Sequence, residues 1–445
     1  MINKPPHHFL HLHRSSTIQP STFPISSITT ITLQQITTIP QQPPKMSIHF
    51  TSKTSHTTTH LVPLLTPLPP LPPSSVHIRP RLLALTTNTF TYAIRGALRI
   101  PGLAWWDAWP TPPAASLPAP FADTVTQYAR VSAWGYSEVV ESTVSGLEVG
   151  TWLFGYQPIG TAVEVLALEE EGEGGWREVS ERRRGLVGER EGLGWDAVMG
   201  VLFQTGYMLN RAVFAWDGPG VHPSGGGAWG AAEADLAGAV VVLLAPSGKT
   251  GLAFAHQLRR GRPTAQQPAR VVAVGSAQSR PFSVQTGLFD EVLAYGDVES
   301  GHGVLERVWG SGGGQQGDAK VVLVNFGARG DAADRWADAL RHSARRFQVV
   351  LVGGAPDATT RGELAGRAAD PTSGVVQMNA GGLRATLGAD FFVGQDAAWK
   401  EFKDGGGVPG LSLSWGRGIE ALQEGWDALA KGEYGPEVGL VYELE

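Results

Sequence analysis

A turn between an apolar run and a helix-like segment carries residue types that bind phosphate groups. Residues 240–244 are all apolar, the next seven read Ala-Pro-Ser-Gly-Lys-Thr-Gly, and residues 251–258 are typical of a helix. A strand, a glycine-bearing turn and a helix N-terminus attract anions, because unpaired N–H groups and the helix dipole face the ligand. The residues that we expect to bind a cofactor here are Ala245, Ser247, Gly248, Lys249, Thr250 and Gly251.

The Gly-Lys-Thr triplet at 248–250 is similar to the end of a P-loop, but its spacing is wrong. A P-loop needs another glycine five positions before the glycine of the triplet, and that position is Leu243. In addition, the apolar run 321–324 ends in Asn325 and not in an aspartate that would help to hold magnesium. Phosphoryl transfer by a P-loop enzyme is therefore disfavoured.

A dinucleotide-binding turn fits the same stretch better. It needs small residues at the turn, at the pyrophosphate and at the contact between helix and strand. Ala245, Gly248 and Gly251 supply these, although Pro246 stands where the stricter motif has its first glycine. The sequence thus favours a dinucleotide, while a strand–turn–helix without a ligand stays open.

The end of the next apolar run, 271–274, indicates which dinucleotide binds. Gly275 and Ser276 follow this run, Arg280 lies four residues further on, and no acidic residue is present. NAD selection usually depends on a carboxylate at this strand end, which holds the ribose 2′-OH. Ser276 and Arg280 can instead hydrogen-bond and neutralise a 2′-phosphate. We predict NADP(H); the alternative is that Arg280 is an ordinary surface residue.

Further residues are expected around the cofactor. The ammonium of Lys249 has two interpretations: it reaches the pyrophosphate, or it projects into solvent from the first helical turn. Asn325, Gly327 and Gly353 follow the fourth and fifth apolar runs of this region. Because ligands of open α/β sheets bind beyond the carboxyl ends of the strands, we expect these three residues to border the nicotinamide.

Composition restricts the function classes. The chain has 445 residues, enough for two or three domains, a net charge of −6 and no cysteine. Disulfides, thiolate zinc sites and cysteine nucleophiles are therefore excluded. The acidic balance argues against nucleic acid, and no apolar run reaches the roughly 18–20 residues of a membrane span. We expect a cytoplasmic protein that acts on a small molecule, with a homodimer left open.

Residues 1–75 are rich in Thr, Ser, Pro, Gln and His and have no clear periodicity. Such a segment cannot bury enough surface to offset its ordering entropy, so we predict a disordered low-complexity tail. Because the tail is poor in acids and rich in hydroxyl groups, a mitochondrial transit segment is an alternative. Met46 offers a second start for the chain.

The remaining residues divide by their periodicity. Residues 76–200 contain short strand-like pieces separated by turns, which is typical of a β-rich domain. Residues 201–375 alternate apolar runs with helical stretches, as expected for a parallel sheet. Residues 376–445 end in a helical stretch and a final strand, and we expect them to return to the first domain. The apolar runs lie at 240–245, 271–274, 291–294, 321–324 and 348–352.

This order resembles the medium-chain dehydrogenase/reductase superfamily, in its zinc-independent quinone and enoyl reductase branch. The segment Asn-Thr-Phe-Thr-Tyr-Ala-Ile-Arg at 88–95 is similar to that family's Asn-x-x-Asp-x-x-x-Arg segment. Ser-Gly-Lys-Thr at 247–250, Trp-Trp-Asp at 105–107 and Trp-Gly-Tyr at 134–136 look like a fungal and bacterial offshoot of unknown function. The resemblance implies an α/β fold with a GroES-like β-rich domain and a doubly wound Rossmann domain.

The resemblance also implies an activity: NADPH-dependent reduction of an α,β-unsaturated carbonyl or quinone. Tyr92 is then the candidate proton donor and Asn88 orients substrate or ribose, while a buried aromatic is the other interpretation of Tyr92. Thr91 replaces the family's Asp, and Lys249-Thr250 replace Gly-Val. These departures favour the alternative, a catalytically inactive nucleotide-binding scaffold or partner-binding protein with the same fold.

Overall fold

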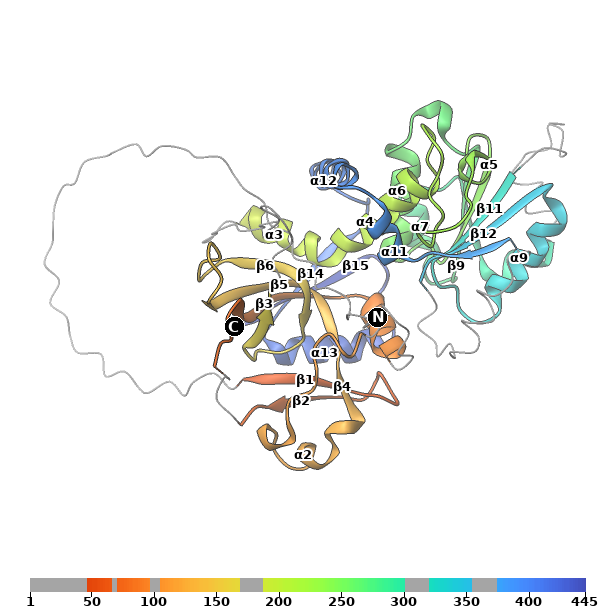
Figure 1. Ribbon diagram of the computed structural model, residues 1–445. Helices are drawn as coiled ribbons and strands as arrows, with labels where there is room; N and C mark the ends of the chain where they lie inside the picture. Colours follow the sequence, from red (N-terminus) through yellow and green to blue (C-terminus); the bar gives the residue numbers. More distant parts are fainter. Residues whose placement is uncertain (1–45, 66–69, 97–104, 169–186, 301–319, 354–373) are drawn as a thin grey trace, which may run out of the picture.

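The computed structural model describes residues 46–65, 70–96, 105–168, 187–300, 320–353 and 374–445. These residues form a β-rich region and a parallel-sheet region that lie side by side (Figure 1). The first 45 residues of the tail predicted for residues 1–75 lie outside the described residues. No helix in the described ranges combines the length and the apolar character needed to cross a bilayer.

The parallel-sheet region is a doubly wound sheet with strand order β10-β9-β8-β11-β12-β13. Its strands are β8 (Val240–Leu244), β9 (Arg270–Gly275), β10 (Glu291–Ala294), β11 (Lys320–Asn325), β12 (Arg346–Leu351) and β13 (Val375–Gln377). The first five match the five apolar runs of the sequence. The short β13 crosses the boundary expected at residue 375.

Helices cover both faces of this sheet, which explains the unbroken apolar strands. All five side chains of β8 are fully buried. Val241 and Leu243 pack with α6 (Lys249–Arg260) on one face, and Val240, Val242 and Leu244 pack with α9 (Ala332–Ser343) on the other. A strand between two helical layers has no polar face, so its sequence does not alternate.

The β-rich region is built on a sheet of order β14-β15-β3-β5-β6, with β7 also paired to β3. Its strands are β3 (Ser75–Leu85), β5 (Ser132–Ser142), β6 (Trp152–Pro158), β7 (Glu164–Ala167), β14 (Ser412–Arg417) and β15 (Val438–Glu443). Because β15 pairs with β3, the end of the chain returns to the first region. The predicted fold class, a GroES-like domain with a Rossmann domain, is confirmed.

A second, three-stranded sheet corrects the prediction for residues 46–75. β1 (Ser47–Ser52) lies between β2 (Thr59–Pro63) and β4 (Tyr128–Arg130). The apolar residues of β1, Ile48 and Phe50, are fully buried. The low-complexity composition hides this short alternation, so the predicted tail does not extend to residue 75.

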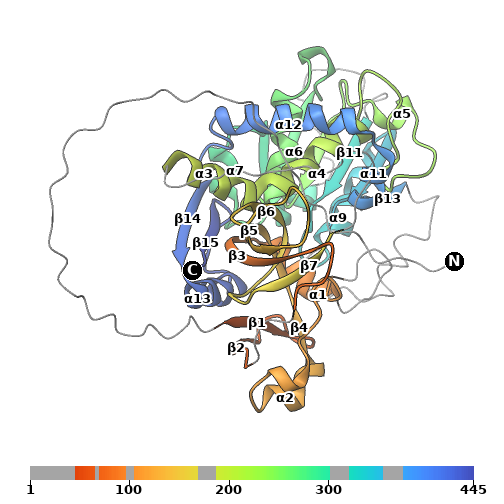
Figure 2. The ribbon, with the colours of Figure 1, turned by 60° about the vertical axis from the view of Figure 1, so that its left-hand side comes forward.

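The other helices complete the two regions. Besides α6 and α9, the α-helices of the described residues are α1 (Thr87–Arg95), α2 (Phe121–Thr124), α3 (Val187–Trp195), α4 (Val201–Met208), α5 (Ala231–Ala234), α7 (Arg280–Gln285), α11 (Ala380–Thr386), α12 (Ala389–Asp404) and α13 (Ile419–Ala430). The π-helices are η4 (Asp196–Gly200) and η5 (Leu209–Val213), and the 3-10 helices are η2 (Ala114–Ser116), η3 (Val125–Gln127), η6 (Thr264–Gln266) and η7 (Tyr295–Ser300). In Figure 2, α13 lies between the larger β-rich sheet and β1–β2.

The continuous helix η4–α4–η5 packs against both regions. One core cluster joins residues of this helix, including Met199 and Phe203, to Leu82 and Tyr136 of the β-rich sheet and to Phe254 of α6. In Figure 2, α12 lies above α4 and α6. The two regions therefore share a core and are not merely tethered.

We expect Phe203→Ala to lower the free energy of unfolding by about 3–5 kcal/mol, because it leaves a cavity in this shared core. Phe203 is fully buried, with ring centroids 5.0 Å from those of Trp399 and Phe402. Denaturant unfolding measures the effect, and Val393→Ala is the control because Val393 is 64% exposed. Equal losses in the two variants would contradict a shared core.

Candidate cofactor-binding site

The turn from β8 to α6 has the shape expected of a phosphate cradle. Ala245 adopts φ +54°, a left-handed conformation that is uncommon for residues other than glycine and concentrates at functional sites. Its N–H donates to the carbonyl of Val274 at 2.9 Å. At Gly251, a Cβ would lie 2.7 Å from the carbonyl oxygen of Pro246, so the helix passes too close to the turn for a side chain.

The N-terminus of α6 leaves its donors available. Gly248 is the N-cap, and no side chain caps the helix. The first turn contains no acidic residue. Because the first N–H groups of a helix have no partner within the helix, this terminus can bind a phosphate through backbone donors and the helix dipole. The predicted residues Ser247 and Thr250 flank these donors.

Lys249 behaves differently from both sequence interpretations. Its ammonium donates to the carbonyl oxygens of Pro436 at 2.6 Å and of Val438 at 2.8 Å, at the start of β15. It neither reaches across the turn nor projects into solvent. Burial lowers the pKa of Lys249 to about 8, although the carboxylate of Glu437 acts in the opposite direction. The side chain thus ties the phosphate turn to the β-rich region.

The end of β9 matches the acid-free pattern of the sequence. Ser276 stabilises the turn that leads into α7, because its Oγ accepts from the N–H of Ser279 at 3.2 Å. A Cβ at Gly275 would come within 2.9 Å of Ser279 Oγ, so this corner is tight. Arg280 begins α7 and is exposed. Its guanidinium is the cationic group that this strand end offers to an anion.

The ends of β11 and β12 form the adjacent part of the same edge. Asn325 is 9% exposed, and its Oδ1 accepts from the N–H groups of Gly327 at 2.9 Å and Ala328 at 2.8 Å. Gly327 and Gly353 both have positive φ, +108° and +75°. Since β8 pairs in parallel with β9 and β11, the turns that follow these strands lie at one edge of the sheet. Asn325 shapes the turn through its side chain and does not project a free amide oxygen.

Asn88 and Tyr92 lie together on α1, in the β-rich region. Asn88 Nδ2 and Trp134 Nε1 both donate to Tyr92 Oη, the latter at 2.9 Å. Tyr92 is 6% exposed, and the rings of Trp105 and Tyr156 lie 4.4 Å and 5.0 Å from it between centroids. Burial raises the pKa of Tyr92 to about 12, although both hydrogen bonds lower it. Its surroundings are those of a buried aromatic residue whose hydroxyl oxygen accepts two hydrogen bonds from the protein.

The sequence does not reveal the hydrogen-bond partners of Tyr92 and Lys249. Trp134 was noted only as part of a resemblance, and nothing pointed to Pro436 or Val438. Carbonyl acceptors leave no trace in a sequence, because every residue has one. A lysine at a position that usually holds a small residue was the one available signal.

Solved structures with this architecture belong to medium-chain dehydrogenases/reductases, and the fold of this chain is of that class. CurA from Vibrio vulnificus matches with a TM-score of 0.54 at 13% identity, over 90% of this chain and 98% of that one. The NADPH complex of CurA gives a TM-score of 0.52 at 11% identity, over 90% and 99%. A complex described as Etr1p/NADP/crotonyl-CoA gives 0.52 at 13%, over 89% and 99%.

The sequence itself identifies a narrower family. Residues 83–435 match the model described as "Protein of unknown function (DUF2855)", and the chain belongs to this family. No curated protein matches the sequence. The relation to the solved structures above is therefore one of fold.

We expect Lys249→Met to lower the free energy of unfolding by about 1–3 kcal/mol, because the carbonyls of Pro436 and Val438 lose their donor. The measurement is denaturant unfolding at pH 7. Lys400→Met is the control, since that side chain is 77% exposed. A loss no greater than that of the control would mean that the tie does not stabilise the fold.

The same pair of proteins gives a pH test. The pKa of Lys249 falls from 10.5 to about 8 on folding, so between these values the unfolded state binds more protons and stability rises with pH. The stability of the natural chain relative to Lys249→Met should therefore increase from pH 8 to pH 10. Lys320 has a similarly lowered pKa, but it is present in both proteins and cancels. A constant difference would contradict the burial of the ammonium.

Proposed function

We propose that this protein binds NADP(H) at the edge formed by the β8, β9, β11 and β12 ends and reduces a polarised double bond. The observation that carries the proposal is the uncapped N-terminus of α6 beside an acid-free end of β9 with exposed Arg280. Backbone donors would hold the pyrophosphate, and Ser276 and Arg280 would meet the 2′-phosphate. Asn325, Gly327 and Gly353 would border the nicotinamide.

The preference for NADP(H) over NAD(H) follows from charge. A carboxylate at the end of β9 would repel a 2′-phosphate, and residues 275–281 contain none. Two solved structures of the same fold are described with NADPH and with NADP. The domain division at residues 76–200, 201–375 and 376–445 and a cytoplasmic location remain proposals from the sequence.

The substrate class that we propose is an α,β-unsaturated carbonyl or a quinone. One neighbour of the same fold is described in complex with crotonyl-CoA, an unsaturated thioester, which supports this class. The bound cofactor supplies the hydride, and the protein must supply a proton. The absence of cysteine argues against a thiolate-held zinc, so we propose a zinc-independent reaction.

Tyr92 is the proton donor that we propose, with Asn88 as its positioning partner. The N–H groups of Asn88 and Trp134 that donate to Tyr92 Oη would stabilise the phenolate that remains after proton transfer. Because both are donors, the Tyr92 proton itself is left to point elsewhere. The low exposure of Tyr92 requires the substrate to enter beside Trp105 and Tyr156.

A second function is favoured by Lys249. Its ammonium is held by Pro436 and Val438, so it is not free to meet a cofactor phosphate unless both hydrogen bonds break. A nucleotide-binding scaffold without catalysis would tolerate this arrangement. Cofactor binding without turnover of any enone, quinone or unsaturated thioester would favour the scaffold over the enzyme.

We expect NADPH to bind more tightly than NADH, and Arg280→Ala to weaken NADPH binding by about 10- to 100-fold while leaving NADH nearly unchanged. Calorimetric titration of both cofactors measures this. Arg260→Ala is the control, because Arg260 is exposed at the opposite end of α6. Equal or tighter binding of NADH would overturn the assignment.

For catalysis, we expect Tyr92→Phe to lower turnover by about 100-fold or more with cofactor affinity unchanged, as for loss of a general acid. The readout is NADPH oxidation at 340 nm with a panel of enones, quinones and crotonyl thioesters, alongside a cofactor titration. Unchanged turnover would remove Tyr92 from the mechanism and leave it as a buried aromatic residue.

A further inference from the structure

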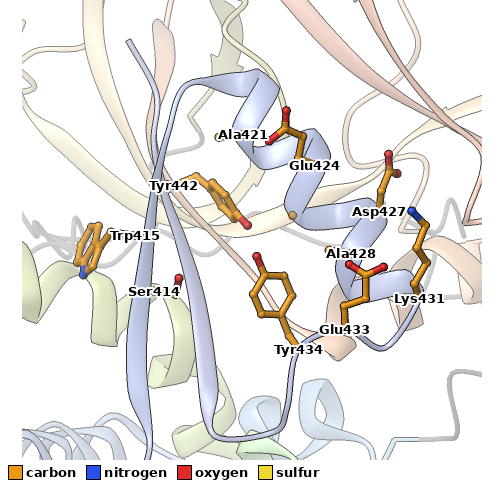
Figure 3. Close-up of a pocket in the computed structure, with 12 residues that line it drawn as sticks. Ser414, Trp415, Ala421, Glu424, Asp427, Ala428, Lys431, Glu433, Tyr434 and Tyr442 are labelled. Atoms are coloured by element: carbon orange, nitrogen blue, oxygen red, sulfur yellow. The ribbon is translucent and has the colours of Figure 1, made fainter.

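A pocket of about 480 Å³ lies between α13 and the strands β14 and β15, far in sequence from the phosphate turn (Figure 3). None of the residues that line it belongs to the candidate cofactor site. It opens in the β-rich region, on the segment that joins α13 to β15. Its chemistry is therefore independent of the proposed reductase activity.

The charge of this pocket is negative. Glu424 and Asp427 project from α13, Glu433 lies on the connecting segment, and Lys431 is the opposing cation. Asp427 Oδ1 already accepts from Gln423 Nε2 at 3.1 Å, whereas Glu424 and Glu433 are exposed. Three carboxylates against one ammonium favour a cationic occupant.

A tyrosine hydroxyl at the floor of the pocket forms no hydrogen bond with the described residues. Tyr442 is 4% exposed, and among the described residues no group forms a hydrogen bond with its Oη. Figure 3 shows this hydroxyl directed between α13 and Tyr434. Gly425 makes the room, because any side chain at this position would overlap the Tyr442 hydroxyl. The Oη therefore faces the space of the pocket, where it is available to exchange a hydrogen bond with a ligand.

The arrangement suits an organic cation better than a metal ion. Among the described residues no three acidic or histidine side chains converge closely enough to hold a metal. Spread carboxylates match a ligand with separated ammonium groups, each of which donates up to three hydrogen bonds. Burial and the neighbouring Glu424 and Tyr434 raise the pKa of Tyr442, so its hydroxyl stays protonated and its oxygen can accept from an ammonium. The ring of Tyr434 adds a face for a cation.

We propose that this pocket binds a small aliphatic diamine or polyamine, with Glu424 and Glu433 pairing its ammonium groups and Tyr442 hydrogen-bonding to it at the floor. The test is calorimetric titration of the full chain with putrescine and spermidine. 1,4-Butanediol is the neutral probe, because it has the length of putrescine without its charges. Saturable binding of putrescine with none of butanediol is the expected result.

Variants locate the binding. Glu424→Gln/Glu433→Gln should weaken putrescine by about fivefold or more, and Tyr442→Phe by about threefold to tenfold. Glu401→Gln is the matched control, since Glu401 is exposed on α12 and its loss changes the net charge away from the pocket. Thermal melting establishes that each variant folds.

Two results would overturn the proposal. The first is the absence of saturable putrescine binding to the natural chain. The second is a loss of affinity in Glu401→Gln that equals the loss in the double variant, because binding would then reflect overall charge. Since Glu424 and Glu433 are exposed, the double variant remains informative even if Tyr442→Phe fails to fold.

Discussion

Burial of the η4–α4–η5 helix between two sheets is the constraint on which the rest of the molecule depends. A parallel sheet needs both faces covered, and α4 with α6 covers one of them. The opposite side of the same helix packs on Leu82, Ala84 and Tyr136 of the β-rich sheet. Side-chain packing in one core thus sets the orientation of the two sheets relative to each other. The same packing fixes where the sheet edge with the phosphate turn lies relative to the β-rich region.

At that edge, the side chains of Asn325 and Ser276 form hydrogen bonds with backbone N–H groups. Asn325 Oδ1 accepts from the N–H groups of Gly327 and Ala328, and Ser276 Oγ accepts from the N–H of Ser279 in the turn before α7. What remains available to a ligand is therefore largely main-chain N–H and the exposed Arg280. Such a surface suits a phosphate, and in the reaction proposed above the proton would come from the β-rich region, where Tyr92 and Asn88 lie.

The parallel sheet could be predicted from the sequence, because strands buried on both faces appear as uninterrupted apolar runs. β1 and β2 could not, since Ile48 and Phe50 alternate within a segment dominated by Thr, Ser and Pro. The turn was recognised from Ala245, Gly248 and Gly251, whose small size the geometry requires. The pocket beside α13 could not be predicted from the sequence, because its hydroxyl, its carboxylates and the space at Gly425 come together only when α13 folds against β15.

The donor and the acceptors of the Lys249 contact, which joins the two regions, respond differently to mutation. Its acceptors are the main-chain carbonyls of residues 436 and 438, which every amino acid carries, so side-chain replacements there leave the acceptors in place. The donor is different, because only a long side chain that ends in an N–H donor can reach these carbonyls from position 249. The contact thus depends on the type of residue at position 249 alone. Substitutions in the segment 436–438 leave the acceptor carbonyls in place.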